Sequence, residues 1–242
     1  MVNQHQQAED TTVIITGGSK GIGKAIAQKF AAEGKTILLC ARNEANLLHT
    51  AQEISSQHTT ASIKTFAADL SDKSQATAFG HWCLQHGTPG ILVNNAGLYM
   101  PGNIYNEPED HLEMMMNSNF FSAYHLTRKL LPAMIKNGSG HIFNICSIAS
   151  LQAYEGGGSY SISKFALDGF SQNLRHELKQ TGIKVTAVFP GAVMTDSWGS
   201  FDNSNKRIME ADDVAVMVLA ATKLSPQAVV EQIVMRPQLG DL

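Results

Sequence analysis

A tyrosine and a lysine at helical spacing have side chains of types that suit acid–base chemistry. Tyr160 and Lys164 stand four positions apart in a segment of helical period, 160–180, so both side chains are expected on one helix face. A phenol has a pKa of about 10, and a nearby ammonium group favours the phenolate. The pair predicts a Tyr160 pKa shifted toward neutral and a side chain that exchanges protons, although this spacing also occurs in ordinary surface pairs.

A glycine-rich turn near the N-terminus is the second candidate. Gly17, Gly21 and Gly23 follow an apolar run, 12–16, and lie at the start of a helical pattern at 22–33. Glycines at such a turn bring backbone N–H groups close to a pyrophosphate, which then lies on the helix N-terminus. A tight turn without a ligand is the alternative, and the spacing differs from the commoner Gly-x-Gly-x-x-Gly. The position between a first strand and a first helix favours a dinucleotide site.

The end of the second expected strand indicates which dinucleotide binds. An acid about 20 residues after the glycines would hold the ribose 2′-hydroxyl of NAD, but this stretch reads Cys40-Ala41-Arg42-Asn43. Arg42 can pair with a 2′-phosphate, and Lys20 in the glycine turn can add charge from the other side. Each basic residue alone could equally be a solvated surface charge, but together they favour NADP(H).

The elements that must position these residues alternate along the chain. Seven short apolar runs alternate with helical segments: strands are expected at 12–16, 36–41, 63–68, 91–94, 140–146, 184–189 and 229–235, and helices at 22–33, 44–57, 73–86, 109–137, 160–180 and 211–223. Strands that are apolar on both faces are typical of a parallel sheet covered by helices. The sequence predicts an α/β fold with a doubly wound, parallel, seven-stranded sheet. No linker divides it, so one domain is expected over 12–242, preceded by a flexible leader at 1–11.

Composition excludes several functional classes. The 242 residues include 43% apolar residues and carry a formal charge of −3, with no basic run to follow a nucleic acid or an anionic membrane. The longest apolar run, 214–221, is far below the ~18 residues of a membrane span. The polar N-terminus lacks the features of a signal peptide, so a soluble cytoplasmic protein is expected.

Cysteines and histidines give no sign of a disulfide framework or a metal site. Cys40, Cys83 and Cys146 are widely spaced and odd in number, which favours buried thiols. The nine histidines form no HxxxH or HExxH pair, so no metal is expected.

Further motifs occur in a characteristic order, and with them the sequence resembles the short-chain dehydrogenase/reductase family over nearly its whole length. The matching motifs are TGGSKGIG at 16–23, Asp69-Leu70, NNAG at 94–97, Asn119, Ser147, the YxxxK motif at 160–164, and Pro190-Gly191 with Thr195. The C-terminal half is most similar to bacterial sepiapterin reductase-like and carbonyl reductase members. The resemblance implies a Rossmann-type domain and an NADP(H)-dependent reduction of a carbonyl to an alcohol.

The resemblance also implies individual roles. Tyr160 would be the proton donor, Lys164 would hold the nicotinamide ribose and relay the proton, and Asn119 would position a water. Ser147 would hydrogen-bond the substrate oxygen and stabilise its developing charge. The residues expected to bind the cofactor are Gly17, Ser19, Lys20, Gly21, Ile22, Gly23, Arg42, Asp69, Leu70, Asn95, Ala96, Gly97, Tyr160, Lys164, Pro190, Gly191, Val193 and Thr195. Taken singly, Ser147 could merely end a strand, and Asn119, two residues from Asn117, could be an ordinary polar helix position.

The substrate side is expected on loops that leave the carboxyl ends of the strands. Tyr154 and Trp198, with Ser147, are the predicted substrate-binding residues, and the apolar lining would include Leu98, Leu151, Val193 and Phe201. Trp198 could stack on a flat ring such as a pterin, or pack on its own loop. Asp196 and Glu155 could bind donor groups of the substrate or be solvated.

The same sequence leaves two alternative functions open and also favours a homo-oligomer. A 3-oxoacyl-[acyl-carrier-protein] reductase is the alternative among enzymes, and a non-catalytic NADP-binding regulator is the alternative outside them. Helical stretches at 120–135 and 160–178 carry more apolar surface than one sheet face needs, which favours a homodimer or homotetramer. The expected partner is otherwise a small carbonyl or alcohol substrate, with no nucleic acid and no membrane.

Overall fold

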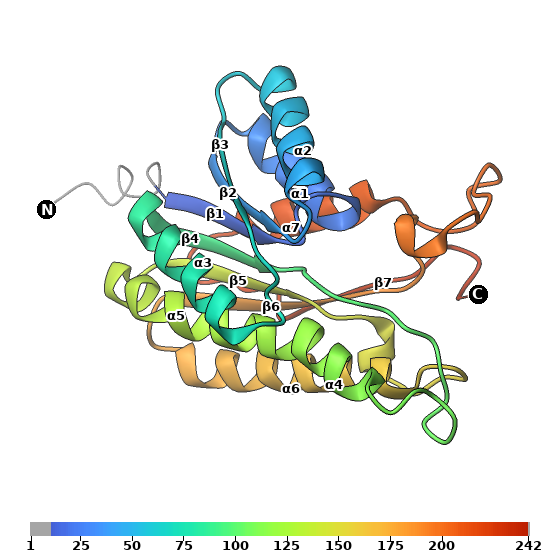
Figure 1. The fold of residues 1–242 in the computed structure, drawn as a ribbon. Helices are drawn as coiled ribbons and strands as arrows, with labels where there is room; N and C mark the ends of the chain where they lie inside the picture. The colour runs from blue at the N-terminus through green and yellow to red at the C-terminus, as the bar shows by residue number, and fades with distance from the viewer. Residues whose placement is uncertain (1–10, 242) are drawn as a thin grey trace, which may run out of the picture.

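The computed structural model describes residues 11–241, which form one seven-stranded sheet between two layers of helices (Figure 1). All neighbouring strands are parallel, in the order β3-β2-β1-β4-β5-β6-β7, which confirms the predicted fold class. The strands are β1 (Thr11–Thr16), β2 (Thr36–Ala41), β3 (Ser62–Ala67), β4 (Thr88–Asn94), β5 (Gly140–Ile145), β6 (Ile183–Pro190) and β7 (Gln232–Met235). Thr11 already belongs to β1, and the rest of the expected leader, 1–10, lies outside the described residues.

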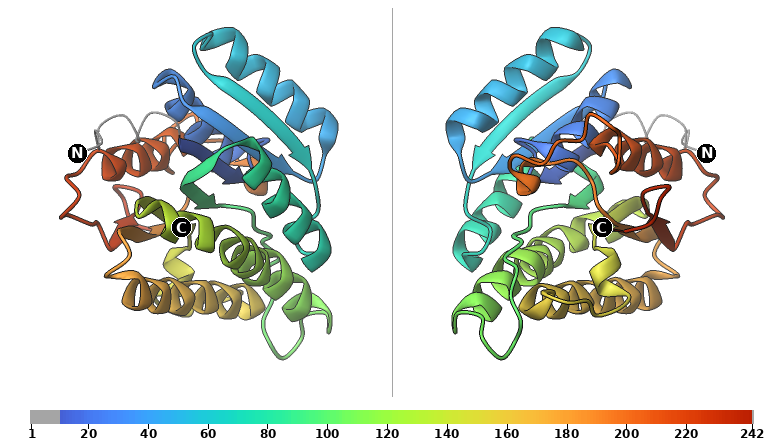
Figure 2. Two further views of the ribbon diagram at one scale, coloured as in Figure 1. Left: turned by 90° about the vertical axis from the view of Figure 1, so that its left-hand side faces the viewer. Right: turned by 90° about the vertical axis from the view of Figure 1, so that its right-hand side faces the viewer.

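The helices divide between the two faces of the sheet. They are α1 (Gly21–Ala32), α2 (Glu44–Gln57), α3 (Lys73–His86), α4 (His111–Met115), α5 (Ser122–Asn137), α6 (Gly158–Leu178) and α7 (Ala211–Thr222). α1, α2 and α7 cover one face, and α3, α5 and α6 cover the other (Figures 1 and 2). Within 11–241, no helix combines the length and the apolar character needed to cross a membrane.

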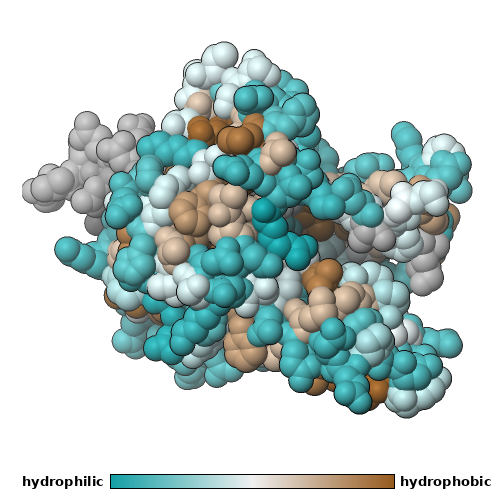
Figure 3. All heavy atoms as spheres, in the orientation of Figure 1, coloured by the Kyte–Doolittle hydropathy of each residue, from teal (hydrophilic) through white to brown (hydrophobic). Residues whose placement is uncertain are grey.

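The alternation of side chains along the central strands explains the two layers. Val13 and Ile15 of β1 enter the core beneath α1, α2 and α7, whereas Ile14 enters the core on the α3, α5 and α6 side. A strand that is buried on both faces needs apolar residues at every position, which is the pattern in the sequence. The three cysteines are free and buried, as predicted. The face of the molecule seen in Figure 3 is mostly hydrophilic, with apolar residues showing at separate places.

One predicted helix differs from the structure. The segment expected as a continuous helix over 109–137 consists of α4, a π-helical turn at Met116–Phe121, and α5. Single π turns inside α-helices are frequent at functional sites. Here the turn contains Asn119, which is 1% exposed.

The strand order also indicates where a ligand would bind. β1 lies between β2 and β4, so the chain leaves β1 and β4 toward opposite sides of the sheet. A crevice forms beyond the carboxyl ends of two such strands, and it is the usual ligand position in this type of sheet.

Candidate active site

The glycine turn joins β1 to α1 at this crevice. Gly17 and Gly21 have φ values of 64° and 53°, a left-handed conformation that favours glycine. A Cβ at Gly23 would lie 2.3 Å from the Gly17 carbonyl oxygen, so the third glycine allows the turn to pack on its own helix. α1 begins without a side-chain cap, which leaves its first N–H groups directed at the crevice.

Asn95 braces this turn from the neighbouring strand. Its Nδ2 donates to the Thr16 and Gly17 carbonyl oxygens at 2.9 and 3.2 Å. The Thr16 hydroxyl oxygen accepts from the backbone N–H groups of Asn95 and Ala96, each at 2.9 Å. The predicted cofactor residue Asn95 therefore also holds the glycine turn in shape.

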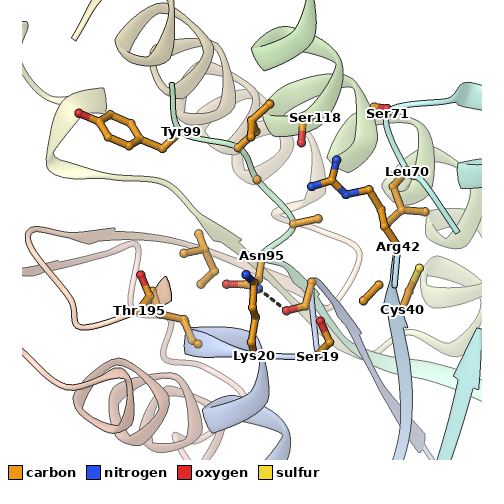
Figure 4. A pocket seen from close by; sticks show the side chains of 18 of the residues that line it. Ser19, Lys20, Cys40, Arg42, Leu70, Ser71, Asn95, Tyr99, Ser118 and Thr195 are labelled. Atoms are coloured by element: carbon orange, nitrogen blue, oxygen red, sulfur yellow. Dashed lines mark hydrogen bonds between the residues drawn. The ribbon is translucent and has the colours of Figure 1, made fainter. Parts of the chain in front are cut away.

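A groove of about 570 Å³ runs from this turn along the carboxyl ends of the strands (Figure 4). Its lining includes most of the predicted cofactor residues: Gly17, Ser19, Lys20, Gly21, Ile22, Arg42, Asp69, Leu70, Asn95, Ala96, Gly97, Tyr160, Lys164 and Thr195. Gly23 lies behind the turn as a packing residue, and Pro190, Gly191 and Val193 line a second cavity. The predicted set is thus divided between two adjoining spaces.

The two basic residues of the groove have different surroundings. Arg42 is exposed, and among residues 11–241 it makes no ion pair or hydrogen bond. Lys20 instead forms an ion pair with Asp196 at 2.8 Å, and both side chains are more than 60% exposed. This pair joins the glycine turn to the loop after β6 and gives Asp196 a partner that was not predicted.

Asp69 shapes the end of the groove near Arg42. Its Oδ1 accepts from the backbone N–H and the hydroxyl of Ser71 at 3.0 and 2.7 Å. Its own backbone N–H donates to Gln75 Oε1 at 2.9 Å. These bonds fix the turn that places Leu70 in the groove wall.

Ser147, Tyr160 and Lys164 come together where the two spaces meet. Ser147 follows β5, and its side chain lies close enough to Tyr160 to lower the pKa of that phenol. Tyr160 stands in the first turn of α6 and lines both spaces, whereas Ser147 lines the second cavity and Lys164 lines the groove. The predicted trio is therefore one cluster.

The electrostatics of this trio differ from the prediction. Burial raises the pKa of Tyr160 to about 12, against an opposing hydrogen bond from Ser147. Burial also lowers the pKa of Lys164 to about 8. Lys164 Nζ donates to the Ile145 carbonyl oxygen at 2.9 Å and lies 5.8 Å from the centre of the Tyr160 ring. The predicted downward shift of the Tyr160 pKa is wrong in this structure, because desolvation outweighs the lowering effect of Ser147.

Asn119 is held behind the trio by hydrogen bonds on both ends of its amide. Its Nδ2 donates to the Leu98 carbonyl oxygen at 2.9 Å and to Ser163 Oγ at 2.8 Å, and its Oδ1 accepts from Leu98 N–H at 2.6 Å. Asn117 is exposed, so Asn119 is the asparagine at the site. A Cβ at Gly97 would lie 3.1 Å from Asn119 Oδ1 and 3.6 Å from Lys164 Nζ, which explains the glycine there.

The second cavity, of about 440 Å³, is aromatic. Tyr154, Trp198 and Val193 line it as predicted, whereas Leu151 and Phe201 do not, and Leu98 lines the groove instead. Trp198 also packs on Phe201 of its own loop, with ring centroids 5.2 Å apart, while it lines the cavity. Asp241 is the one charged residue in the described lining, and its carboxylate pairs with Arg236.

Tyr99 is a site residue that the sequence analysis missed. Its ring meets the Tyr160 ring edge-on at 4.9 Å between centroids, and it lines both spaces. Its position on the loop directly after NNAG, beyond the carboxyl end of β4, was the available signal.

Comparisons with known proteins agree with this geometry. The family model described as short chain dehydrogenase matches residues 11–206. A sepiapterin reductase of Chlorobaculum tepidum is 33% identical over 95% of this chain and 97% of its own length. A metagenomic short-chain oxidoreductase, solved in complex with NADP, is 30% identical, with a TM-score of 0.83 over 96% of this chain and 99% of the other. An alcohol dehydrogenase from Thermococcus sibiricus, complexed with 5-hydroxy-NADP, shares the fold at 24% identity, with a TM-score of 0.89 over 96% of this chain and 98% of the other.

The family match covers most of the chain and includes the glycine turn, the Ser147, Tyr160 and Lys164 cluster, and Asn119. The chain belongs to the short-chain dehydrogenase family.

Proposed function

We propose that this protein is an NADP(H)-dependent oxidoreductase that reduces a carbonyl group to an alcohol. The observation that carries the proposal is the position of Tyr160, which lines both the cofactor groove and the aromatic cavity. A carbonyl oxygen in the cavity and a reductant in the groove would both lie next to its hydroxyl group.

The residues of the groove fit a dinucleotide phosphate. Gly17, Gly21 and Gly23 provide the close backbone approach that a pyrophosphate needs at the N-terminus of α1. Arg42 supplies an unpaired guanidinium at the end of β2, where a 2′-phosphate would lie, and the stretch 40–43 itself contains no acid. The nicotinamide, when bound, supplies the hydride.

The catalytic side chains then have separate tasks. Tyr160 gives its hydroxyl proton to the substrate oxygen as that oxygen becomes an alcohol, and its high pKa keeps the phenol protonated at neutral pH. Ser147 donates a hydrogen bond to the same oxygen and stabilises its developing charge. Lys164 holds the ribose and relays a proton, and Asn119 positions a water on the path toward solvent.

The cavity supports a flat or small carbonyl substrate, of the pterin type or a simple ketone. Tyr99, Tyr154 and Trp198 offer rings for stacking, and Asp241 offers a carboxylate for a hydrogen-bond donor. The similarity to a sepiapterin reductase supports this choice.

Turnover of NADPH with a carbonyl panel tests the proposal. The panel contains ketones, diketones, sepiapterin and 3-oxoacyl thioesters, and NADPH oxidation is followed by absorbance. Tyr160→Phe is expected to abolish turnover, whereas Tyr105→Phe, at an 85% exposed position, serves as the matched control. Undiminished turnover by Tyr160→Phe would contradict the role of Tyr160.

Two alternatives give different results in the same assay. Preference for a 3-oxoacyl thioester on its carrier protein would favour the acyl-carrier reductase, although no basic surface run is present to dock an acidic carrier. Tight NADPH binding without turnover on any carbonyl would favour a regulator.

We propose a homodimer or homotetramer as the working form. Ile135 on α5 and Ile162 and Phe165 on α6 expose apolar side chains on the same helical layer. Light scattering coupled to size exclusion measures the assembly, and a monomer at micromolar concentration would contradict it.

A further inference from the structure

We propose that Glu107 is a positioning residue for Tyr160, because it caps the catalytic helix α6 from a separate loop. The proposal rests on the proposed function and assigns a role to a residue outside the groove and the cavity. Glu107 lies on the loop between β4 and α4, 53 positions before Tyr160 in the sequence.

The start of α6 lacks a cap of its own. Its N-cap residue is Gly157, which has no side chain to accept from the first N–H groups of the helix. Glu107 supplies that acceptor: its Oε2 accepts from the Ser159 N–H at 3.3 Å, and its Oε1 accepts a short hydrogen bond from the Ser159 hydroxyl. A carboxylate at this position also suits the positive end of the helix dipole.

Two glycines make this contact sterically possible. Gly158 has a φ of 33°, and a Cβ there would lie 2.4 Å from the Gly102 carbonyl oxygen and 2.7 Å from Glu107 Oε2. A Cβ at Gly102 would lie 2.7 Å from the Glu107 Cβ. Backbone bonds add to the contact, because Gly102 N–H donates to the Gly156 carbonyl oxygen at 3.0 Å. The loop and the helix start are therefore interlocked.

The loop contacts Tyr160 from two directions. Glu107 fixes the backbone of Ser159, the residue directly before Tyr160, and Tyr99 packs edge-on against the Tyr160 ring at 4.9 Å. At its base the loop is held by Asn119, whose amide pairs with both backbone groups of Leu98. Loss of Glu107 would release the helix turn that orients the Tyr160 hydroxyl, and small misplacements of a catalytic group are costly.

The test compares Glu107→Ala, Glu107→Gln and the control Glu109→Ala, at an exposed position of the same loop. Glu107→Ala is expected to lower kcat about tenfold while the Kd for NADPH, measured by fluorescence, stays within about twofold of wild type. Glu107→Gln retains one acceptor for Ser159, so its kcat is expected between those of wild type and Glu107→Ala. The Glu109→Ala variant is expected to keep the wild-type kcat.

A change in NADPH affinity with unchanged kcat would overturn the proposal, as would wild-type kcat in Glu107→Ala. If Glu107→Ala does not fold, Ser159→Ala replaces it, because this variant removes the hydroxyl donor from the same contact. The kcat of Ser159→Ala is expected to fall. The double variant Glu107→Gln/Ser159→Ala is expected to have a kcat only slightly below that of Glu107→Gln alone.

Hydrogen exchange separates a failure of this proposal from a failure of the proposed function. In Glu107→Ala, the amides in the first turn of α6 are expected to exchange faster than in Glu109→Ala. Unchanged exchange would refute the cap whether or not the wild-type protein turns over a carbonyl. Faster exchange together with an inactive wild-type protein would leave the cap in place, refute the proposed function and overturn the catalytic purpose assigned to the cap.

Discussion

Replacement of Lys164 by Met is expected to stabilise the cofactor-free protein at neutral pH while it abolishes activity. Lys164 is 5% exposed, and its burial lowers the pKa from 10.5 to about 8. At about 1.4 kcal/mol per pKa unit, a charged Lys164 costs the folded state about 3 kcal/mol below pH 8. Methionine removes that cost but leaves the Ile145 carbonyl oxygen without its donor, a loss of about 1 to 2 kcal/mol. The net gain at pH 7 is therefore about 1 to 2 kcal/mol.

The sign of the pH dependence follows from proton binding. Between pH 8 and 10.5, the unfolded chain keeps the Lys164 proton that the folded chain has lost, so wild-type stability rises with pH relative to the variant. The advantage of Lys164→Met is expected to be greatest at pH 7 and to shrink through this range. Near pH 10.5 the variant is expected to be less stable than wild type, because only the lost hydrogen bond remains.

Urea denaturation of both proteins at pH 7, 8, 9 and 10 measures this difference directly. Lys136→Met, at an exposed position on α5, is the control and is expected to show no such trend. A stability difference that does not change with pH, or a Lys164→Met variant less stable than wild type at pH 7, would refute the reasoning.

Three further predictions concern the cofactor groove. Arg42→Asp is expected to weaken NADPH binding about 10- to 100-fold and NADH binding far less, because charge-assisted bonds to a 2′-phosphate are lost. Fluorescence titration measures both affinities, and an equal loss for the two cofactors would contradict the assignment. Asp196→Asn is expected to release Lys20 from its ion pair and to tighten NADPH binding up to about fivefold, since an exposed ion pair is worth at most about 1 kcal/mol. Weaker NADPH binding by this variant would argue against Lys20 as a phosphate ligand. Gly23→Ala is expected to lower the free energy of unfolding by about 2 kcal/mol or more, because its Cβ would overlap a backbone oxygen. Gly169→Ala, whose Cβ would have no neighbour within 4 Å among residues 11–241 outside its own helix backbone, is the control and is expected to lose no stability. Equal denaturation midpoints for the two variants would show that the glycine turn relaxes around the new methyl group.

The fold was predictable because its pattern is local. The central strands are short and apolar on both faces, and helical segments alternate with the strands, so the alternation alone indicates a covered parallel sheet. The grouping of Ser147 with Tyr160 and Lys164 was expected from the resemblance to the family, whereas the strand pattern alone indicates only that residues after parallel strands gather at one edge of the sheet.

The pairings within the site were not predictable from the sequence. Lys20 and Asp196 are 176 positions apart, and nothing local to either residue indicates that they meet. The direction of the Tyr160 pKa shift depends on how much water surrounds the ring, which a spacing of four residues does not report. The π turn at Met116–Phe121 contains Asn119, whose partners Leu98 and Ser163 are both distant in sequence.

The strand order has a consequence for how the chain is made. While synthesis has reached only α3, β1 has β2 on one edge and an unpaired edge on the other, because its second neighbour, β4, follows α3 in the sequence. The glycine turn gains the brace from Asn95 only when β4 docks, and Tyr160 arrives with α6, more than 60 residues later. A nascent chain cannot gain stability from the complete site before α6 is made, and the open edge of β1 is the segment to be shielded until β4 docks.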